Sequence, residues 1–157
     1  MKKTLIVFYS RTGITKKIGE LIAKKIGGDV EELIDEKDRS GPLGYVMAGK
    51  DAALKKLTEI KPLKNNPEDY KTIILGTPIW AYTMAPALRT YIEKNKTILK
   101  KKATAFFCTQ ESSGGEKTLK EMETILGKPV AELELSKKDI EPINENKLKE
   151  FLDNIKK

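Results

Sequence analysis

The fold is decided by the stretch Leu5-Ile6-Val7-Phe8-Tyr9-Ser10-Arg11-Thr12-Gly13-Ile14-Thr15. Its first part, up to Tyr9, is an unbroken apolar run, which is typical of a strand buried on both faces of a sheet. Between Ile14 and Ile26, apolar residues recur at helical spacing with charged residues between them, until Gly27-Gly28 ends the pattern. The stretch therefore predicts a buried strand, a short polar loop and an amphipathic helix in direct succession.

The same alternation continues along the rest of the chain. Further strands are expected at 30–34, 72–76, 103–108 and 130–135. Helices are expected from Pro86, around 119–126 and around 148–155, and the less regular region 35–70 is expected to hold one helix at 48–57. Strands that alternate with helices predict an α/β fold, in which helices cover both faces of a parallel sheet.

The order of the strands follows from their polarity. The strands at 5–9, 72–76 and 103–108 are apolar throughout, as expected in the middle of a sheet. Glutamates within 30–34 and 130–135 favour the two edges. With right-handed crossovers, this predicts a doubly wound five-stranded parallel sheet of order 2-1-3-4-5, a three-layer sandwich. Ligands of such sheets bind beyond the carboxyl ends of the strands where the winding reverses, here between the first and third strands.

Composition limits the kinds of protein that this chain can be. Its 157 residues suit a single domain, 1–157, and one cysteine, Cys108, allows no disulfide within the chain. No signal peptide is evident and no apolar run approaches the roughly 18 residues of a membrane span, so we expect a cytoplasmic protein without membrane contact. The absence of histidine excludes Ser-His and Cys-His nucleophile pairs and histidine metal sites, and we expect no metal.

The net charge of +7 is compatible with a nucleic-acid partner, but the residue types argue against one. Only 3 of the 30 basic residues are arginine, and aromatic residues make up 6% of the chain. Proteins that bind nucleic acids rely on arginine forks and stacking aromatics. We therefore expect a lysine-rich solvated surface and no nucleic-acid partner.

The loop Ser10–Thr15 has the features of a phosphate site. Three hydroxyls and Gly13 precede a helix N-terminus, where free backbone N–H groups and the helix dipole favour an anion. Taken alone, the loop also fits an ordinary strand-to-helix turn with Thr12 or Thr15 as the N-cap. It is neither a P-loop nor a dinucleotide fingerprint, because it lacks the Gly-Lys-Ser/Thr sequence of the one and the glycine triad of the other.

Two further loops should open at the same end of the sheet. In the loop 77–83, Trp80 and Tyr82 should protrude and suit stacking on a flat conjugated ligand, unless one of them folds back over the following helix. The loop 109–115 is small, polar and rich in glycine, so it suits the polar edge of a ring; alone, it also fits a flexible lead-in to a helix. Together, the three loops predict a phosphorylated aromatic cofactor.

At these positions the chain resembles the flavodoxin-like family. The family's phosphate loop, hydroxyl-x-Thr-Gly-x-Thr, matches Ser10 to Thr15. Gly-Thr-Pro-Ile-Trp-Ala at 76–81 resembles the second flavin loop of the flavodoxin and quinone-reductase group, and Ser-Ser-Gly-Gly-Glu-Lys-Thr at 112–118 resembles the third loop of many small members. The resemblance spans Thr4 to Ile155 and implies a flavodoxin-like fold that binds FMN noncovalently and moves electrons through it.

The resemblance also implies which residues contact FMN. The phosphate would be held by Ser10, Arg11, Thr12, Gly13, Ile14 and Thr15, with Arg11 and Ile14 contributing N–H groups. The isoalloxazine ring would lie against the second loop, formed by Thr77, Pro78, Ile79, Trp80, Ala81 and Tyr82. Its pyrimidine edge would meet the third loop, formed by Thr109, Gln110, Ser112, Ser113, Gly114 and Gly115.

Two functions compete within this resemblance. One is an electron carrier, and the other is an NAD(P)H-dependent FMN reductase of quinones or other small acceptors. The absence of a nucleotide signature favours the carrier, for which no catalytic residue is assigned. A third alternative is a basic binding or scaffold protein that holds no flavin.

The partner expected for an electron carrier follows from the charge. Typical flavodoxins are acidic and dock basic proteins, whereas this chain is basic. We therefore expect an acidic, ferredoxin-like redox partner or a small-molecule acceptor. The lysine cluster at 94–102 is expected at the end opposite the flavin, and the chain is expected to be a monomer or a homodimer.

Other proteins with a related strand order are excluded by single residues. A phosphorelay receiver needs an acidic pair after the first strand and an aspartate after the third, where this chain has Ser10-Arg11 and Thr77. A cysteine phosphatase needs an arginine six residues after its cysteine, where Cys108 is followed by Gly114. Cys108 is therefore expected to be a small core residue, with a redox role as the alternative.

Overall fold

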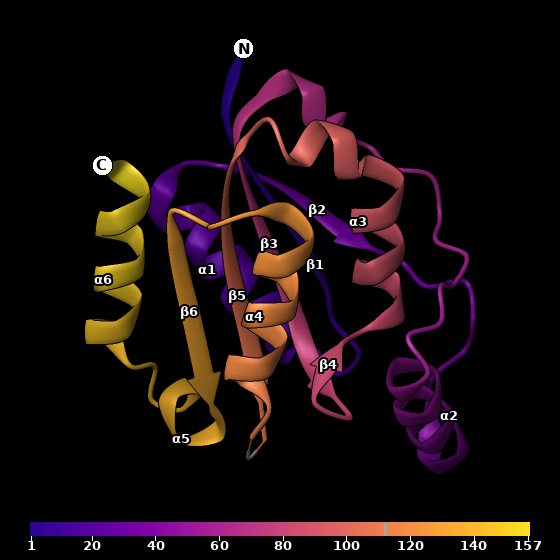
Figure 1. Cartoon of the computed structure of the whole chain (residues 1–157). Coiled ribbons are helices and arrows are strands. Elements are labelled where there is room, and N and C mark those ends of the chain that lie inside the picture. Colours follow the sequence, from indigo (N-terminus) through magenta and orange to yellow (C-terminus); the bar gives the residue numbers. More distant parts are fainter. Residues whose placement is uncertain (112) are drawn as a thin grey trace.

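A central parallel sheet forms the middle layer of the fold (Figure 1). The computed structural model describes residues 1–111 and 113–157. The sheet order is β2-β1-β3-β5-β6, and β4 pairs with β3. The strands are β1 Lys2–Tyr9, β2 Asp29–Leu33, β3 Tyr70–Trp80, β4 Thr83–Met84, β5 Ala103–Gln110 and β6 Ala131–Ser136. The five parallel strands thus confirm the order 2-1-3-4-5 that the sequence predicts.

Helices cover both faces of the sheet. Their bounds are α1 Ile14–Ile26, α2 Gly41–Ala53, η1 Pro67–Asp69, α3 Pro86–Leu99, α4 Gly115–Leu126, α5 Lys137–Ile140 and α6 Glu145–Lys156. Apolar residues of α3 and α4 pack on one face of the sheet, and those of α1 and α6 pack on the other. Figure 1 shows α2 beside the end of the sheet at which the strands terminate.

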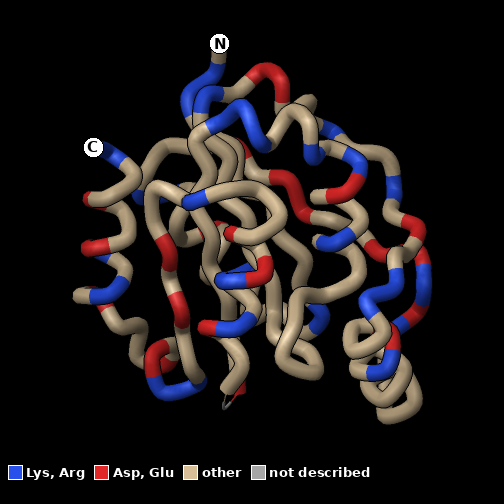
Figure 2. Tube along the Cα trace, in the orientation of Figure 1, with Lys and Arg blue, Asp and Glu red and all other residues tan. Residues whose placement is uncertain are grey.

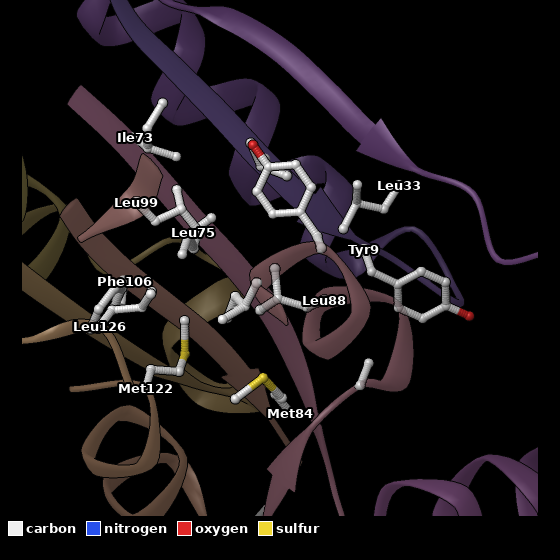
Figure 3. Packing of buried hydrophobic residues seen from close by; sticks show 14 of the residues in the cluster. Tyr9, Leu33, Ile73, Leu75, Met84, Leu88, Leu99, Phe106, Met122 and Leu126 are labelled. Atoms are coloured by element: carbon white, nitrogen blue, oxygen red, sulfur yellow. The ribbon is translucent and has the colours of Figure 1, made fainter. Parts of the chain in front are cut away.

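The alternation of side chains along the strands divides the core into two clusters. Leu5, Val7 and Tyr9 of β1 point to the α3 and α4 side, whereas Ile6 and Phe8 point to the α1 and α6 side. Figure 3 shows the first of these clusters, in which Leu88 of α3 and Met122 of α4 meet side chains of β3 and β5. Both faces of β1 are buried, so both sets of alternating side chains must be apolar. This explains the unbroken apolar run.

The helix expected at 48–57 was placed wrongly. The helix is α2, Gly41–Ala53, with Pro42 in its first turn. Its buried positions are small or charged (Gly44, Ala48, Asp51 and Ala52), whereas Leu43, Tyr45 and Val46 are exposed. The apolar residues therefore do not mark the buried face of this helix, which is why hydrophobic periodicity misplaced it.

The loop expected at 77–83 is a hairpin. β3 continues to Trp80 and pairs antiparallel with β4 through Ile79–Met84 and Trp80–Thr83. The two connecting residues, Ala81 and Tyr82, have φ angles of 49° and 62°. Two-residue hairpin turns with positive φ usually carry Asn-Gly or Asp-Gly, and Ala81-Tyr82 is neither, so no hairpin turn was expected here.

Lysines gather at the end of the sheet at which the strands begin. Figure 2 shows these blue segments around the N-terminus, including the beginning of β1 and the residues after α3. The lysines include Lys2, Lys3, Lys71, Lys100 and Lys101, all of which are exposed. This group is called the basic end below. It contains the lysine-rich segment that follows α3, which the topology places away from the ends of the strands.

Candidate functional site

The three predicted loops meet at the carboxyl end of the sheet. The hydroxyls of Thr15 and Thr109 lie 2.9 Å apart and are buried, which joins the first loop to the third. Gly114 packs so closely on the hairpin that a Cβ atom there would lie 2.9 Å from Ile79 and 3.0 Å from the backbone of Tyr82. The first, second and third loops therefore form one surface, as the fold topology requires.

The first loop opens α1 without a side-chain cap. Gly13 is the N-cap residue with a φ of 95°, and its N–H donates to Ser10 Oγ at 3.1 Å. No side chain in the described residues caps this helix, and Thr12, Gly13 and Ile14 are exposed. The N-cap role considered for Thr12 or Thr15 is therefore wrong. Among residues 1–111 and 113–157, no side chain caps the first-turn N–H groups of α1, which can therefore bind an anion.

Arg11 points away from this loop. Its Nε donates to the Arg39 carbonyl at 2.8 Å, and its Nη2 donates to the Gly41 carbonyl at 3.1 Å. Its guanidinium also lies 5.5 Å from the centre of the Tyr45 ring. The side chain of Arg11 thus connects the first loop to the start of α2. Of Arg11, only the backbone N–H is left for the phosphate contact that the resemblance implies.

The two aromatic residues of the hairpin differ in exposure. Tyr82 is 58% exposed at the turn and protrudes as expected. Trp80 is half-buried, and its ring stands at 87° to that of Tyr9 with the centroids 5.4 Å apart. Trp80 therefore does not protrude freely, and it packs against the core cluster on the α3 side of the sheet. It packs on Tyr9, whose burial, together with the negative charge of Asp35, raises the pKa of the phenol to about 12.

The third loop is fixed by Gln110. Its Nε2 donates to Glu134 at 2.5 Å, and its Oε1 accepts the N–H of Gly115 at 2.7 Å. The Gln110 side chain is thus engaged within the protein rather than offered to a ligand. Ser113 is exposed and Gly114 has a φ of 102°, whereas Ser112 lies outside the described residues.

A buried ion cluster beside Trp80 was not predicted. Arg39 donates to Asp35 at 2.7 Å and to Asp51 at 3.0 Å, and Lys37 also donates to Asp51 at 2.7 Å. The sequence signal for this cluster is weak: Arg39 is one of few arginines in a lysine-rich chain, and the carboxylates lie on either side of it.

Neither a metal-binding group of side chains nor a membrane-spanning helix is found in the described part of the chain. Within residues 1–111 and 113–157, no three carboxylate or thiol side chains gather closely enough to hold a metal ion. None of the helices described there combines the length and the apolar character needed to cross a membrane.

Cys108 is a core residue. It is fully buried among the side chains facing α3 and α4, and burial raises the pKa of its thiol to about 12, with Glu134 adding to the effect. Since the thiolate is the reactive form, the native thiol should be inert near neutral pH.

A thiol reagent tests this assignment. Ellman's reagent at pH 8 should leave the native protein unlabelled and should label one thiol per chain in concentrated urea, because unfolding restores an ordinary thiol pKa. Rapid labelling of the native protein, with its circular dichroism unchanged, would contradict the core role and favour the redox alternative.

A comparison with models of protein families identifies the family of the chain. The model of a family described as the flavodoxin domain matches residues 45–138, more than half of the chain. The chain belongs to the flavodoxin domain family. None of the curated proteins searched matches it significantly.

Solved structures share the flavodoxin fold. One is a flavoprotein from Lactobacillus acidophilus NCFM in complex with FMN, with 22% identity, a TM-score of 0.69, and coverage of 92% of this chain and 99% of that one. Another is an apo NADH:FMN oxidoreductase, with 12% identity, a TM-score of 0.64, and coverage of 99% and 87%. A flavodoxin from the domain Archaea has 16% identity, a TM-score of 0.53, and coverage of 98% and 99%. At these identities the likeness establishes the fold.

Proposed function

We propose that this flavodoxin-domain protein binds FMN at the carboxyl end of its sheet and transfers electrons between redox partners. The observation that carries the proposal is the meeting of three loops around the open start of α1. There, Thr15 contacts Thr109, and Gly114 packs on Tyr82. The family match and the similar structure that contains FMN support the choice of cofactor.

The residues of the first loop fit a phosphate. The Ser10 and Thr12 hydroxyls and the uncapped N–H groups of α1 lie on one loop, and Gly13 adds no side chain to obstruct them. Neutral donors can satisfy a dianion if enough of them converge, and a helix N-terminus adds its dipole. Since the Arg11 side chain is directed to α2, backbone N–H groups and hydroxyls supply this binding.

The residues of the second and third loops fit a flat ring. Tyr82 is exposed beside Gly114, and Trp80 presents a half-buried indole at the same end of the sheet. Bound FMN supplies one- and two-electron chemistry, while the protein supplies binding, orientation and the electrostatic environment. The three loops would hold the cofactor and exclude water from part of its ring.

An electron carrier is favoured over an NAD(P)H-dependent reductase because the sequence carries no nucleotide-binding fingerprint. The net charge of +7 supports an acidic, ferredoxin-like redox partner or a small-molecule acceptor. Ionic strength should distinguish these acceptors, since salt screens docking of an acidic protein and barely affects an uncharged quinone.

Fluorescence and turnover test the proposal in sequence. The chain has a single tryptophan, so FMN added to flavin-free protein should quench the emission of Trp80 in a saturable way. No quenching and no co-elution of flavin would remove the proposed function and favour a flavin-free binding protein. If FMN binds, NADPH and a quinone are added next. Sustained NADPH oxidation would replace the carrier with the reductase.

Removing one hydroxyl should weaken FMN binding. Thr12→Ala should lower the affinity by about 1–3 kcal/mol, because a charged acceptor loses a donor. The matched control is Lys100→Glu at the basic end, which changes the charge but should leave the affinity nearly unchanged. Titration of each variant by Trp80 quenching measures both. An equal loss in the two variants would mean that long-range charge, rather than the loop, controls binding.

A further inference from the structure

Trp80 lies between two side chains from different parts of the fold. The Tyr9 ring from the end of β1 meets it edge to face, with the centroids 5.4 Å apart. The Arg39 guanidinium, from the segment between β2 and α2, lies 5.9 Å from the centre of the indole. A cation at this distance from an indole is attracted by the electrons of the ring.

The Arg39 guanidinium is itself held on two sides. Asp35 Oδ2 accepts from its Nε at 2.7 Å and Asp51 Oδ2 accepts from its Nη1 at 3.0 Å, while the residue is only 4% exposed. Burial opposes the charge, but the hydrogen bonds from Arg39 to both carboxylates raise its pKa above the ordinary value. The planar fork of arginine can bridge two carboxylates in this way, whereas a lysine ammonium is a point charge on a flexible stem.

The backbone of Arg39 is fixed as well. Its carbonyl accepts from Arg11 Nε of the phosphate loop at 2.8 Å. Gly44 of α2 packs so closely on it that a Cβ atom at Gly44 would lie 2.3 Å from the carbonyl carbon of Arg39. Side chain and backbone are therefore both fixed, and Arg39 links the first loop, α2 and the hairpin at one point.

We propose that Arg39 is a positioning residue that, clamped between Asp35 and Asp51, sets the orientation of the Trp80 indole and so prepares the ring-binding side of the site. The functional part of this proposal rests on the proposed binding of FMN. Arg39 acts through Trp80 and needs no contact with the flavin itself. Its arrangement is a preorganising one, because the indole is held by contacts within the protein itself.

The emission of the single tryptophan tests the orientation without any flavin. Arg39→Lys keeps the charge and loses the fork, and Asp51→Asn keeps the shape and an acceptor oxygen but removes the negative charge that pairs with Arg39. Both variants should show lower emission anisotropy of Trp80 and faster quenching by acrylamide in flavin-free protein. Asp139→Asn is the matched control, since Asp139 is 5% exposed against 4% for Asp51 and lies in α5, at the opposite edge of the sheet from α2 (Figure 1).

Three outcomes are decisive. If Trp80 responds to Arg39→Lys and Asp51→Asn but not to Asp139→Asn, all being folded by circular dichroism, the positioning role holds. If Trp80 is unchanged in folded Arg39→Lys protein, the role is overturned. If Arg39→Lys does not fold, Asp51→Asn alone decides, by the same two readings.

Titration with FMN then tests whether the positioning of Trp80 by Arg39 affects cofactor binding. Arg39→Lys should weaken FMN binding about two- to fivefold, the loss expected for one cation–ring contact. Wild-type protein that binds no FMN would end the proposed function yet leave the emission result intact. Normal FMN affinity in a variant whose Trp80 has become mobile would show that the indole orientation does not serve the flavin, which overturns the functional part.

Discussion

Gly13→Val should remove most of the affinity for FMN, with the dissociation constant rising about ten- to a hundredfold. Gly13 has a φ of 95° at the start of α1, where a β-branched residue is strained by roughly 1–2 kcal/mol. Space is not the obstacle, because a Cβ atom at Gly13 would have no neighbour within 4 Å. In the variant, the backbone at position 13 should relax toward negative φ. This change would turn the N–H groups of the first loop away from the phosphate.

The control is a glycine at the other end of the same helix. Gly27 has a φ of 72° and equally open surroundings, so Gly27→Val should cost similar stability and leave FMN affinity nearly unchanged. Isothermal calorimetry with FMN and urea unfolding measure the two quantities separately. Tight flavin binding by the Gly13 variant would place the phosphate elsewhere.

Two glycines of α2 should respond in opposite directions to the same substitution. Gly44→Ala should lower the free energy of unfolding by about 1–3 kcal/mol, because the methyl group would overlap the backbone of Arg39, which cannot move aside like a flexible side chain. A Cβ atom at Gly49 would have no neighbour within 4 Å. Gly49→Ala should therefore raise the free energy of unfolding by about 0.5–1 kcal/mol, since alanine favours a helix.

Urea midpoints of the two variants measure the contrast, and Trp80 emission adds a second readout. The Gly44 variant should also loosen Trp80, because α2 and Arg39 are packed together there. Equal stabilisation by both substitutions would mean that α2 does not approach Arg39 closely in solution. The pair thus tests whether the first turns of α2 pack on the backbone of Arg39.

The sequence predicts the parts of this fold that repeat a simple burial pattern. β1 and α1 follow from the apolar run to Tyr9 and the spacing from Ile14 to Ile26, because each buries its apolar residues in the usual period. The strand order follows from the glutamates at the edges. The three loops follow from that order, since parallel strands end on one side.

The parts that were missed lack the residue pattern that usually marks such structures. α2 buries glycine, alanine and aspartate and exposes Leu43. Its large apolar residues therefore do not lie on the buried face, as they usually do in a helix. The hairpin after β3 turns through Ala81 and Tyr82 without a glycine or asparagine. Arg39 is held by carboxylates on either side of it in the sequence, and the indole that it faces, Trp80, lies at the end of β3. Neither the turn nor the ion pairs follow a residue pattern that hydrophobic periodicity or the common turn sequences would reveal.

The basic end has a practical consequence for attaching the molecule to a surface. Its lysines lie where the strands begin, and the three loops lie where they end (Figure 2). On a negatively charged electrode, the protein should therefore adsorb lysines first, with the three loops directed into solution. Direct electron transfer between the electrode and the three loops, measured by voltammetry, would then be slow, because electrons would have to cross the whole length of the sheet. A dissolved mediator would reach the loops without obstruction.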